Sequence, residues 1–179
     1  MDYFIRDAQV QDARALAEIY TLGWQFAYEG LMPQNYLDSL EIEARVPFWE
    51  ETLLIAPAQR KSTRRVALDS EGAVLGVVSF GADREGNVER GEIYTLYARP
   101  SKIGQGIGFA LLAHALGALT EQGVESVILW VLEGNERAMS FYESQGFRLT
   151  GRVREEPLGD VVLKDLQMLR HLGSVAVED

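Results

Sequence analysis

The spacing of hydrophobic residues changes along the first hundred positions, and the change predicts helices followed by strands. A short strand is expected over residues 3–6, and apolar residues then recur at helical spacing from Asp7 to Tyr28. A short helix around 36–40 and a longer one over 42–54 follow, so residues 1–56 are predicted to be mainly helical. The next segments are rich in valine and alanine, and they predict strands over 65–69, 73–82 and 92–99.

The second half of the chain alternates between helices and strands, with glycines at the boundaries. A helix is expected from the glycine-rich segment 104–108 to about Gln122, and Gly123 ends it. A buried strand over 126–132 comes next, and Asn135 is a suitable N-cap for a helix that Gly146 ends. Two last strands are expected over 147–153 and 161–169. This order predicts an α/β protein with a mixed sheet of six to seven strands and helices on both faces.

The composition is that of a globular protein and excludes several kinds of site. The 179 residues are 47% hydrophobic and 25% charged, and no apolar run approaches the ~20 residues of a membrane span. Cysteine is absent and only two histidines occur, which excludes thiolate catalysis and disfavours a metal centre or a Ser-His-Asp triad. A net charge of −10 disfavours nucleic acid binding. We expect one cytoplasmic domain over residues 1–179, a monomer or homodimer that needs no metal or membrane.

A glycine-rich segment, Gly104-Gln105-Gly106-Ile107-Gly108, follows the third of these strands and opens a helix. This arrangement is typical of phosphate binding, because a helix N-terminus presents backbone N–H groups and the positive end of its dipole. A P-loop is excluded, because Phe109-Ala110 stands where Lys and Ser or Thr are required. Phe109 also replaces the third glycine of a dinucleotide fingerprint. A coenzyme A pyrophosphate site and a tight turn without a ligand remain open.

Two segments resemble motifs of the GNAT superfamily of acetyl-CoA-dependent N-acetyltransferases. Residues 103–108 are similar to motif A, Q/R-x-x-G-x-G/A, with Ile103 where the family commonly has Gln or Arg. Residues 135–147 are similar to motif B, N-x-x-A-x-x-F-Y-x-x-x-G-F, at every fixed position. The resemblance implies a GNAT-like fold, an acetyl-CoA-binding core over residues 91–150, an acceptor-side region over residues 1–56, and acetyl-CoA as co-substrate.

The same resemblance assigns residues to the coenzyme. The strand residues would pair with the pantetheine arm, the glycine turn would hold the pyrophosphate, and the helix cap would also contact pantetheine. The residues expected to bind acetyl-CoA are Leu96, Tyr97, Ala98, Gly104, Gln105, Gly106, Ile107, Gly108, Phe109, Asn135 and Tyr142.

Acetyl transfer to an amine requires a base for the amine and an acid for the departing thiolate. Glu92 is the predicted base, because Gly91-Glu92-Ile93 resembles a stretch of histone-type acetyltransferases. The alternatives are that Glu92 lies at the solvent-exposed start of its strand or pairs with an arginine, and Glu133 is a second candidate. Tyr142 is the predicted acid, because a phenol with a pKa of about 10 is protonated at neutral pH; simple packing is the alternative. Without cysteine no thiol can form an acyl-enzyme, so direct transfer is expected.

The acceptor is expected to be a primary amine: a small molecule, a polyamine, or an amino group of a peptide or protein. By the resemblance, residues 24–54 and a loop expected at 154–160 border the acceptor. Residues 29–51 hold six acids and one base, a balance that attracts a cationic amine unless the face is merely solvated. The basic residues at 60, 61, 64 and 65 are expected to be solvated, with a coenzyme phosphate as the alternative partner. A non-catalytic coenzyme A sensor, or an interaction domain, on the same fold is the alternative function.

Overall fold

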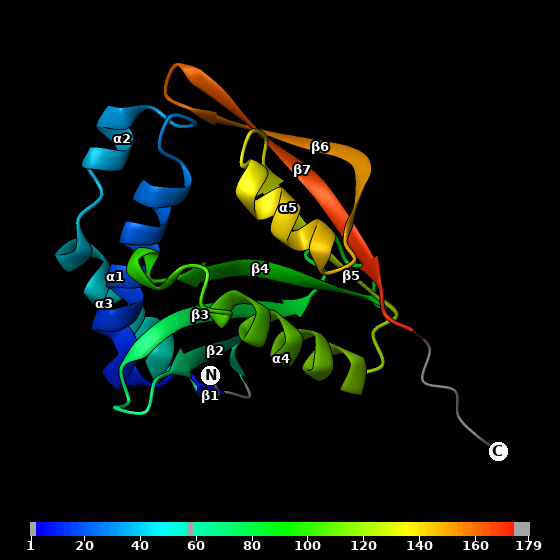
Figure 1. Cartoon of the computed structure of the whole chain (residues 1–179), viewed down its shortest axis with the longest axis horizontal. Helices are drawn as coiled ribbons and strands as arrows, with labels where there is room; N and C mark the ends of the chain where they lie inside the picture. The colour runs from blue at the N-terminus through cyan, green and yellow to red at the C-terminus, as the bar shows by residue number, and fades with distance from the viewer. Residues whose placement is uncertain (1–2, 57–58, 174–179) are drawn as a thin grey trace. The chain divides into compact units, whose positions relative to one another are not determined.

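The computed structural model describes residues 3–56 and 59–173, and within them seven strands form one sheet. The strand order is β1-β2-β3-β4-β5-β7-β6 (Figure 1). Strands β4 and β5 are parallel, whereas the pairs β1–β2, β2–β3, β5–β7 and β6–β7 are antiparallel. The sheet is therefore mixed, as the order of the elements predicts.

The elements lie close to their predicted positions. The strands are β1 (Phe4–Asp7), β2 (Thr63–Leu68), β3 (Val74–Ala82), β4 (Arg90–Ala98), β5 (Ser126–Leu132), β6 (Arg148–Leu158) and β7 (Val161–His171). The α-helices are α1 (Ala13–Ala27), α2 (Gln34–Asp38), α3 (Ile42–Leu54), α4 (Ile107–Glu121) and α5 (Glu136–Ser144), with short 3-10 turns at Val10–Asp12 and Pro100–Lys102.

The chain divides into two compact units. The first unit contains the residues up to Phe80 together with Tyr94–Ala115, and the second contains Gly81–Ile93 together with the residues from Leu116 onward. Strand β4 and helix α4 each contribute to both units. The single domain expected over residues 1–179 stays a prediction, and its residues 1–2, 57–58 and 174–179 lie outside the described residues.

The first unit is built around the apolar faces of α1 and α3. Leu16, Ile19 and Tyr20 of α1 recur at helical spacing and are buried with Trp49 of α3. The remaining members of this core are Ala8, Ala13, Ala17, Leu53, Val66, Leu68, Val74 and Val77. Helical residues 42–54 and the strands of 63–82 therefore share one core, which fixes the position of α1 beside the strands.

Helix α1 begins later than the hydrophobic spacing predicts. Asp7 belongs to β1, where it pairs with Arg65, and α1 proper starts at Ala13. The Asp12 carboxylate accepts hydrogen bonds from the backbone N–H of Gln9 at 2.8 Å and from the Arg6 guanidinium at 2.6 Å. The side chain of Asp12 thus closes the chain into a 3-10 turn before the helix, and the expected start at Asp7 is wrong.

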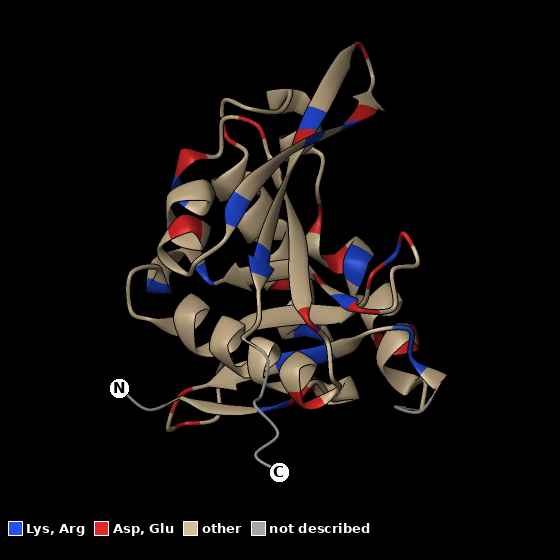
Figure 2. Cartoon of the chain, turned by 90° about the vertical axis from the view of Figure 1, so that its right-hand side faces the viewer, with Lys and Arg blue, Asp and Glu red and all other residues tan. Residues whose placement is uncertain are grey.

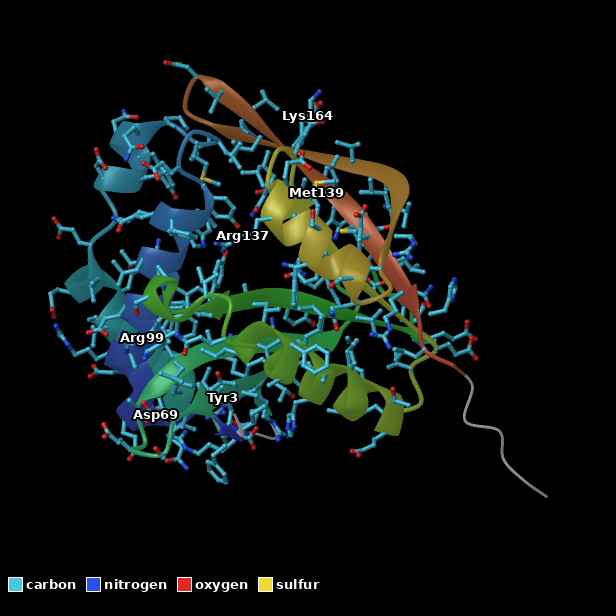
Figure 3. All side chains as sticks on the ribbon, viewed as in Figure 1. Tyr3, Asp69, Arg99, Arg137, Met139 and Lys164 are labelled. Carbon is cyan, nitrogen blue, oxygen red and sulfur yellow. The ribbon has the colours of Figure 1, made fainter. Side chains whose placement is uncertain are left out.

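The second unit contains a long hairpin of β6 and β7 in place of the loop expected at 154–160. The strands stay paired as far as Leu158 and Val161, so only Gly159 and Asp160 form the turn. Charged side chains pair across the strands: Arg154 with Asp165 at 2.7 Å, and Lys164 (Figure 3) with Glu155 at 3.8 Å. Figure 2 shows residues of both signs on this hairpin. A polar run on an exposed edge strand resembles a loop in sequence, and the cross-strand pairs overturn that prediction.

Candidate active site

Strand β4 continues beyond its ladder with β5. The paired residues run from Arg90 with Ser126 to Ile93 with Leu129, whereas β4 itself extends to Ala98. The peptide groups of residues 94–98 on that edge lie beyond this ladder. Backbone N–H and C=O groups there could pair with an extended ligand, as an added strand would. Leu96, Tyr97 and Ala98, the residues predicted to meet pantetheine, belong to this segment.

The side chain of Tyr97 is directed at α1 of the same unit. Its ring centroid lies 5.1 Å from that of Tyr20, and its hydroxyl lies 3.1 Å from the hydroxyl of Tyr28. A Cβ added to Gly23 would come within 2.9 Å of the Tyr97 ring, so glycine at that position permits the contact. We therefore expect Tyr97 to meet a coenzyme through its backbone.

Tyr20 ties the same strand to the core of the first unit. Its hydroxyl lies 2.6 Å from Oγ1 of Thr95, and burial raises the pKa of the phenol. The hydroxyl therefore stays protonated and acts as a structural hydrogen-bond group, which holds residues 94–98 against α1.

The predicted glycine turn leads directly into α4. Gly104 and Gly106 have φ of +82° and +85°, a left-handed conformation that favours glycine, and an added Cβ would meet no atom within 4 Å at either position. The N–H of Ala110 donates to the carbonyl of Gly106 at 3.0 Å, which starts the helical ladder. The N–H groups of residues 107–109 precede that ladder and have no partner within the helix.

The two apolar residues of the turn have different roles. Ile107 is 1% exposed and anchors the first turn of α4, whereas Phe109 is 57% exposed. Gly76 of β3 explains how closely α4 approaches the sheet, because a Cβ at Gly76 would lie 2.8 Å from Ile107 Cγ2. The turn and residues 94–98 both belong to the first unit, so this unit alone carries the strand and the turn predicted to bind the coenzyme.

The arginines of residues 60–65 bind other parts of the first unit. Arg60 donates to the carbonyls of Leu53 and Ile55, each at 2.7 Å, and so caps the C-terminal end of α3. Arg64 lies over the ring of Trp49 at 5.7 Å, and burial lowers the pKa of its guanidinium. The third arginine, Arg65, pairs with Asp7 at 2.7 Å and contacts His114 at 2.9 Å. The expectation of a solvated basic loop is wrong for these three residues.

In the second unit, Glu92 is buried and bound by Arg84. The side chain is 1% exposed. Its Oε2 accepts a hydrogen bond from the backbone N–H of Arg84 at 3.1 Å. Its Oε1 accepts hydrogen bonds from Nε of the Arg84 side chain at 3.0 Å and from Nη2 of the same side chain. A carboxylate has about four lone-pair sites, so these three bonds leave one on Oε2. The arginine pair is present, and the role of Glu92 as a base, acting through water, stays a prediction.

The Arg84–Glu92 pair lies next to a chain of ion pairs. Asp83 and Glu85, on either side of Arg84, both bind Arg90, at 2.6 and 2.9 Å. Glu85 also binds Arg152 of β6 at 2.6 Å. The hydrogen bond from Arg152 lowers the pKa of the Glu85 carboxyl. Residues 83–90 are therefore tied to β4 and β6 by charge-assisted hydrogen bonds.

Asn135 is the N-cap of α5, as predicted. Its Oδ1 accepts the backbone N–H of Ala138 at 3.2 Å. The cap uses one of the two lone pairs on the side-chain oxygen, and the NH₂ group is the donor that a contact to pantetheine could use. Figure 3 labels Arg137 and Met139 on the helix that follows this cap.

Tyr142 lies on α5 between two other aromatic rings. Its ring centroid is 5.3 Å from that of Phe141 and 5.8 Å from that of Phe147, and its side chain is half-buried. Packing and an acid role are compatible for Tyr142. The two neighbouring rings contact its aromatic ring, whereas the acid role would use its hydroxyl group. The acid role of Tyr142 stays a prediction.

The six acids of residues 29–51 are all exposed. They are Glu29, Asp38, Glu41, Glu43, Glu50 and Glu51. Glu43 binds Arg14 at 2.7 Å, and this hydrogen bond lowers the pKa of its carboxyl. The single base of this stretch, Arg45, lies over the ring of Trp24 at 5.8 Å. The first unit therefore presents an exposed acidic segment next to a group of aromatic rings.

The sequence agrees with a known family over most of its length. Residues 16–147 match the model of the Acetyltransferase (GNAT) family. The chain belongs to the GNAT family. A relative from Bacillus subtilis (strain 168), "Uncharacterized N-acetyltransferase YuaI", is 30% identical over 175 residues, which cover 92% of this chain and 96% of that protein.

Two further relatives carry more specific names. The "Spermidine N(1)-acetyltransferase" of Thermoplasma acidophilum is 24% identical over 149 residues, which cover 83% of this chain and 90% of that protein. A GNAT superfamily phosphinothricin acetyltransferase from Sinorhizobium meliloti, solved in complex with AcCoA, has a TM-score of 0.72 and 26% identity, and covers 100% of this chain and 93% of that one. This GNAT member is an acetyl-CoA-dependent acyltransferase.

Two features are absent from the described residues, 3–56 and 59–173. Within these ranges no helix is both long enough and apolar enough to cross a bilayer. Within the same ranges no group of three or more His, Asp or Glu side chains gathers in a way that could hold a metal ion.

Sequence reasoning did not identify three contacts within the two units. The partner of Glu92 is Arg84, the arginine at 152 reaches Glu85, and the hydroxyl of Tyr3 reaches the glycine turn at Gln105. The first could have been anticipated from the arginine alternative for Glu92. The other two join residues 67 and 102 positions apart, and no local pattern indicates them.

Proposed function

We propose that this GNAT member transfers the acetyl group of acetyl-CoA directly to a primary amine, and that the amine carries more than one positive charge. The observation that carries the proposal is the strand–turn–helix of the first unit: residues 94–98 beyond the β5 ladder, two left-handed glycines, and the start of α4. A pantetheine arm needs an open strand edge, and a pyrophosphate needs convergent N–H groups at a helix N-terminus.

The proposed coenzyme contacts are mostly backbone groups. Leu96, Tyr97 and Ala98 would pair with the amides of pantetheine. The N–H groups of the turn, residues 104–109, would bind the pyrophosphate oxygens, which suits a chain whose arginines at 60, 64 and 65 already bind protein groups. In the second unit, Asn135 would donate its side-chain NH₂ to the pantetheine arm while its oxygen caps α5.

The proposed reaction is one displacement at the thioester carbon. The amine nitrogen attacks the carbonyl carbon, a C–N bond forms, and the C–S bond then breaks with its electron pair on sulfur. Tyr142 gives its phenolic proton to that thiolate. The proton lost by the amine passes through water to the single remaining lone-pair site on Oε2 of Glu92. The chain contains no cysteine whose thiol could form an acyl-enzyme, and this supports direct transfer.

The exposed acids of residues 29–51 support a cationic acceptor. A field of this sign raises the local concentration of a polycation and repels an acceptor that bears a carboxylate. The name of the Thermoplasma relative, a spermidine acetyltransferase, points to the same class of amine. We therefore place polyamines and basic peptides before anionic amino acids.

A donor and acceptor screen tests the proposal. Acetyl-CoA is supplied with spermidine, with butylamine as a monocation, and with glutamate, and thiol release is measured at low and high salt. Spermidine is expected to give the highest kcat/KM. Added salt is expected to reduce kcat/KM more for spermidine than for butylamine, because the Debye length, over which charges act, falls to about 8 Å at physiological ionic strength. A chain that binds coenzyme A but acetylates none of these amines would contradict amine acetylation.

Charge variants separate the acceptor proposal from the reaction. Replacing both Glu50 and Glu51 by Gln is expected to lower kcat/KM for spermidine by about threefold to tenfold, with little change for butylamine. Glu71→Gln, in the exposed turn between β2 and β3, is the control for the loss of one acid outside residues 29–51 and should change neither. Equal effects on both amines would remove the electrostatic proposal and leave acetyl transfer intact.

A further inference from the structure

The hydroxyl of Tyr3 reaches across the chain to the glycine turn. It donates to the backbone carbonyl of Gln105 at 2.6 Å, and both residues belong to the first unit. Tyr3, labelled in Figure 3, directly precedes β1, whose residues Phe4–Asp7 are paired with β2. The donor is therefore attached to a strand that is itself fixed in the sheet.

The carbonyl that Tyr3 holds belongs to the same peptide group as the N–H of Gly106. This peptide bond is planar and trans, so its C=O and N–H point in opposite directions. A hydrogen bond that fixes the Gln105 carbonyl therefore also fixes the direction of the Gly106 N–H, which points away from Tyr3. Gly106 is the central glycine of the turn that leads into α4.

The turn needs such a contact because its own residues leave this peptide group able to rotate. Glycine adopts positive and negative φ at similar cost, and at both Gly104 and Gly106 an added Cβ would meet no atom within 4 Å. Ile103, the residue before the turn, has an apolar side chain that can offer no hydrogen bond to it. Rotation of the Gln105–Gly106 peptide would turn the Gly106 N–H away from its present direction.

We propose that Tyr3 is a positioning residue for the acyl donor: its hydroxyl holds the Gln105–Gly106 peptide in the orientation that aims the Gly106 N–H at the pyrophosphate of coenzyme A. The inference rests on the proposed function, because it needs the turn to bind that pyrophosphate. Tyr3 does not touch the coenzyme, and its effect is confined to the affinity for donors that carry a pyrophosphate.

Calorimetric titration of Tyr3→Phe with coenzyme A, with dephospho-coenzyme A and with pantetheine tests the inference. The first two ligands keep the pyrophosphate and the third lacks it. The variant is expected to bind both pyrophosphate ligands about threefold to tenfold more weakly, the factor for one lost hydrogen bond, with no change for pantetheine. In steady-state assays KM for acetyl-CoA should rise by the same factor while kcat stays at the wild-type value.

Ser144→Ala is the matched control, because it also removes an exposed hydroxyl that donates to a backbone carbonyl at 2.6 Å, at the end of α5. It should leave all three affinities unchanged. The amide resonance of Gly106 in the ligand-free protein gives a second measurement, and it should shift in Tyr3→Phe alone. Unchanged affinity for coenzyme A in Tyr3→Phe, or an equal loss for pantetheine, would overturn the inference. A folded wild-type chain that binds no coenzyme A would instead overturn the proposed function.

Discussion

Replacing Gly76 by Ala tests whether close packing of α4 on β3 sets the position of the coenzyme turn. A Cβ at this position would lie 2.8 Å from Ile107 Cγ2, 2.9 Å from the Tyr97 carbonyl oxygen and 3.1 Å from Leu111 Cδ1. Two of these neighbours belong to the first turns of α4, and the third is backbone of the strand predicted to meet pantetheine. The Tyr97 carbonyl cannot yield without moving the strand, and the buried Ile107 side chain cannot yield without moving the start of α4.

The expected cost follows from these distances. Normal contact requires about half an ångström of movement by α4 or β4, and overpacking of this kind costs about 1–3 kcal/mol. For a chain of 179 residues, that corresponds to a decrease in Tm of about 3–10 °C. Because the movement falls on the start of α4, the Kd for coenzyme A should also rise. Thermal unfolding followed by circular dichroism and calorimetric titration measure the two effects.

Gly117→Ala is the matched control for this substitution. Gly117 lies within α4, and an added Cβ would meet nothing within 4 Å. Alanine there should stabilise the protein by up to ~1 kcal/mol, because it restricts the unfolded chain and favours the helix. Gly76→Ala should cost less stability in an Ile107→Ala background than in the wild type, because the Cγ2 contact is then absent. A Gly76→Ala protein as stable as Gly117→Ala, or strict additivity with Ile107→Ala, would refute the packing account.

Three further predictions concern the turn, the acid and the ion pairs. Gly106→Val should weaken coenzyme A binding by more than about tenfold in calorimetry, because a β-branched residue is strained at φ of +85°; unchanged affinity would remove the turn from the site. Tyr142→Phe should lower kcat by about 10²–10⁴-fold with KM little changed, and wild-type turnover would leave Tyr142 a packing residue. The pKa of Glu85 is lowered from its ordinary value of 4.5, so its pair with Arg152 stabilises the folded protein at pH values above 4.5. This stabilisation is lost as the pH falls below that value and Glu85 becomes protonated. The Tm difference between wild type and Glu85→Gln should therefore shrink below that pH, and a difference that is constant with pH would contradict the assignment.

Local sequence patterns were enough to predict the helices and strands and to identify the two GNAT motifs. Gly123 and Gly146 end α4 and α5 with φ of +79° and +84°, and the N–H groups of Val124 and Phe147 close the helix ends. Asn135 caps α5 as its position indicates. These features depend on the conformational preferences of residues a few positions apart, which the sequence shows directly. The GNAT family assignment depends on the same short motifs and spacings.

Only the tertiary structure decided which side chains meet. The sequence predicted a solvated basic loop for the arginines at 60, 64 and 65. In the structure Arg60 binds the end of α3, Arg64 lies over the ring of Trp49, and Arg65 contacts an aspartate and a histidine. A long guanidinium side chain can reach many partners, and burial and register select one. Burial and register likewise select Arg84 as the partner of Glu92. The polar run 154–158 forms a strand because residues of β7 provide opposite charges across the ladder. The contact from Tyr3 to Gln105 joins residues 102 positions apart, and it exists because sheet pairing of β1 brings the start of the chain to the glycine turn.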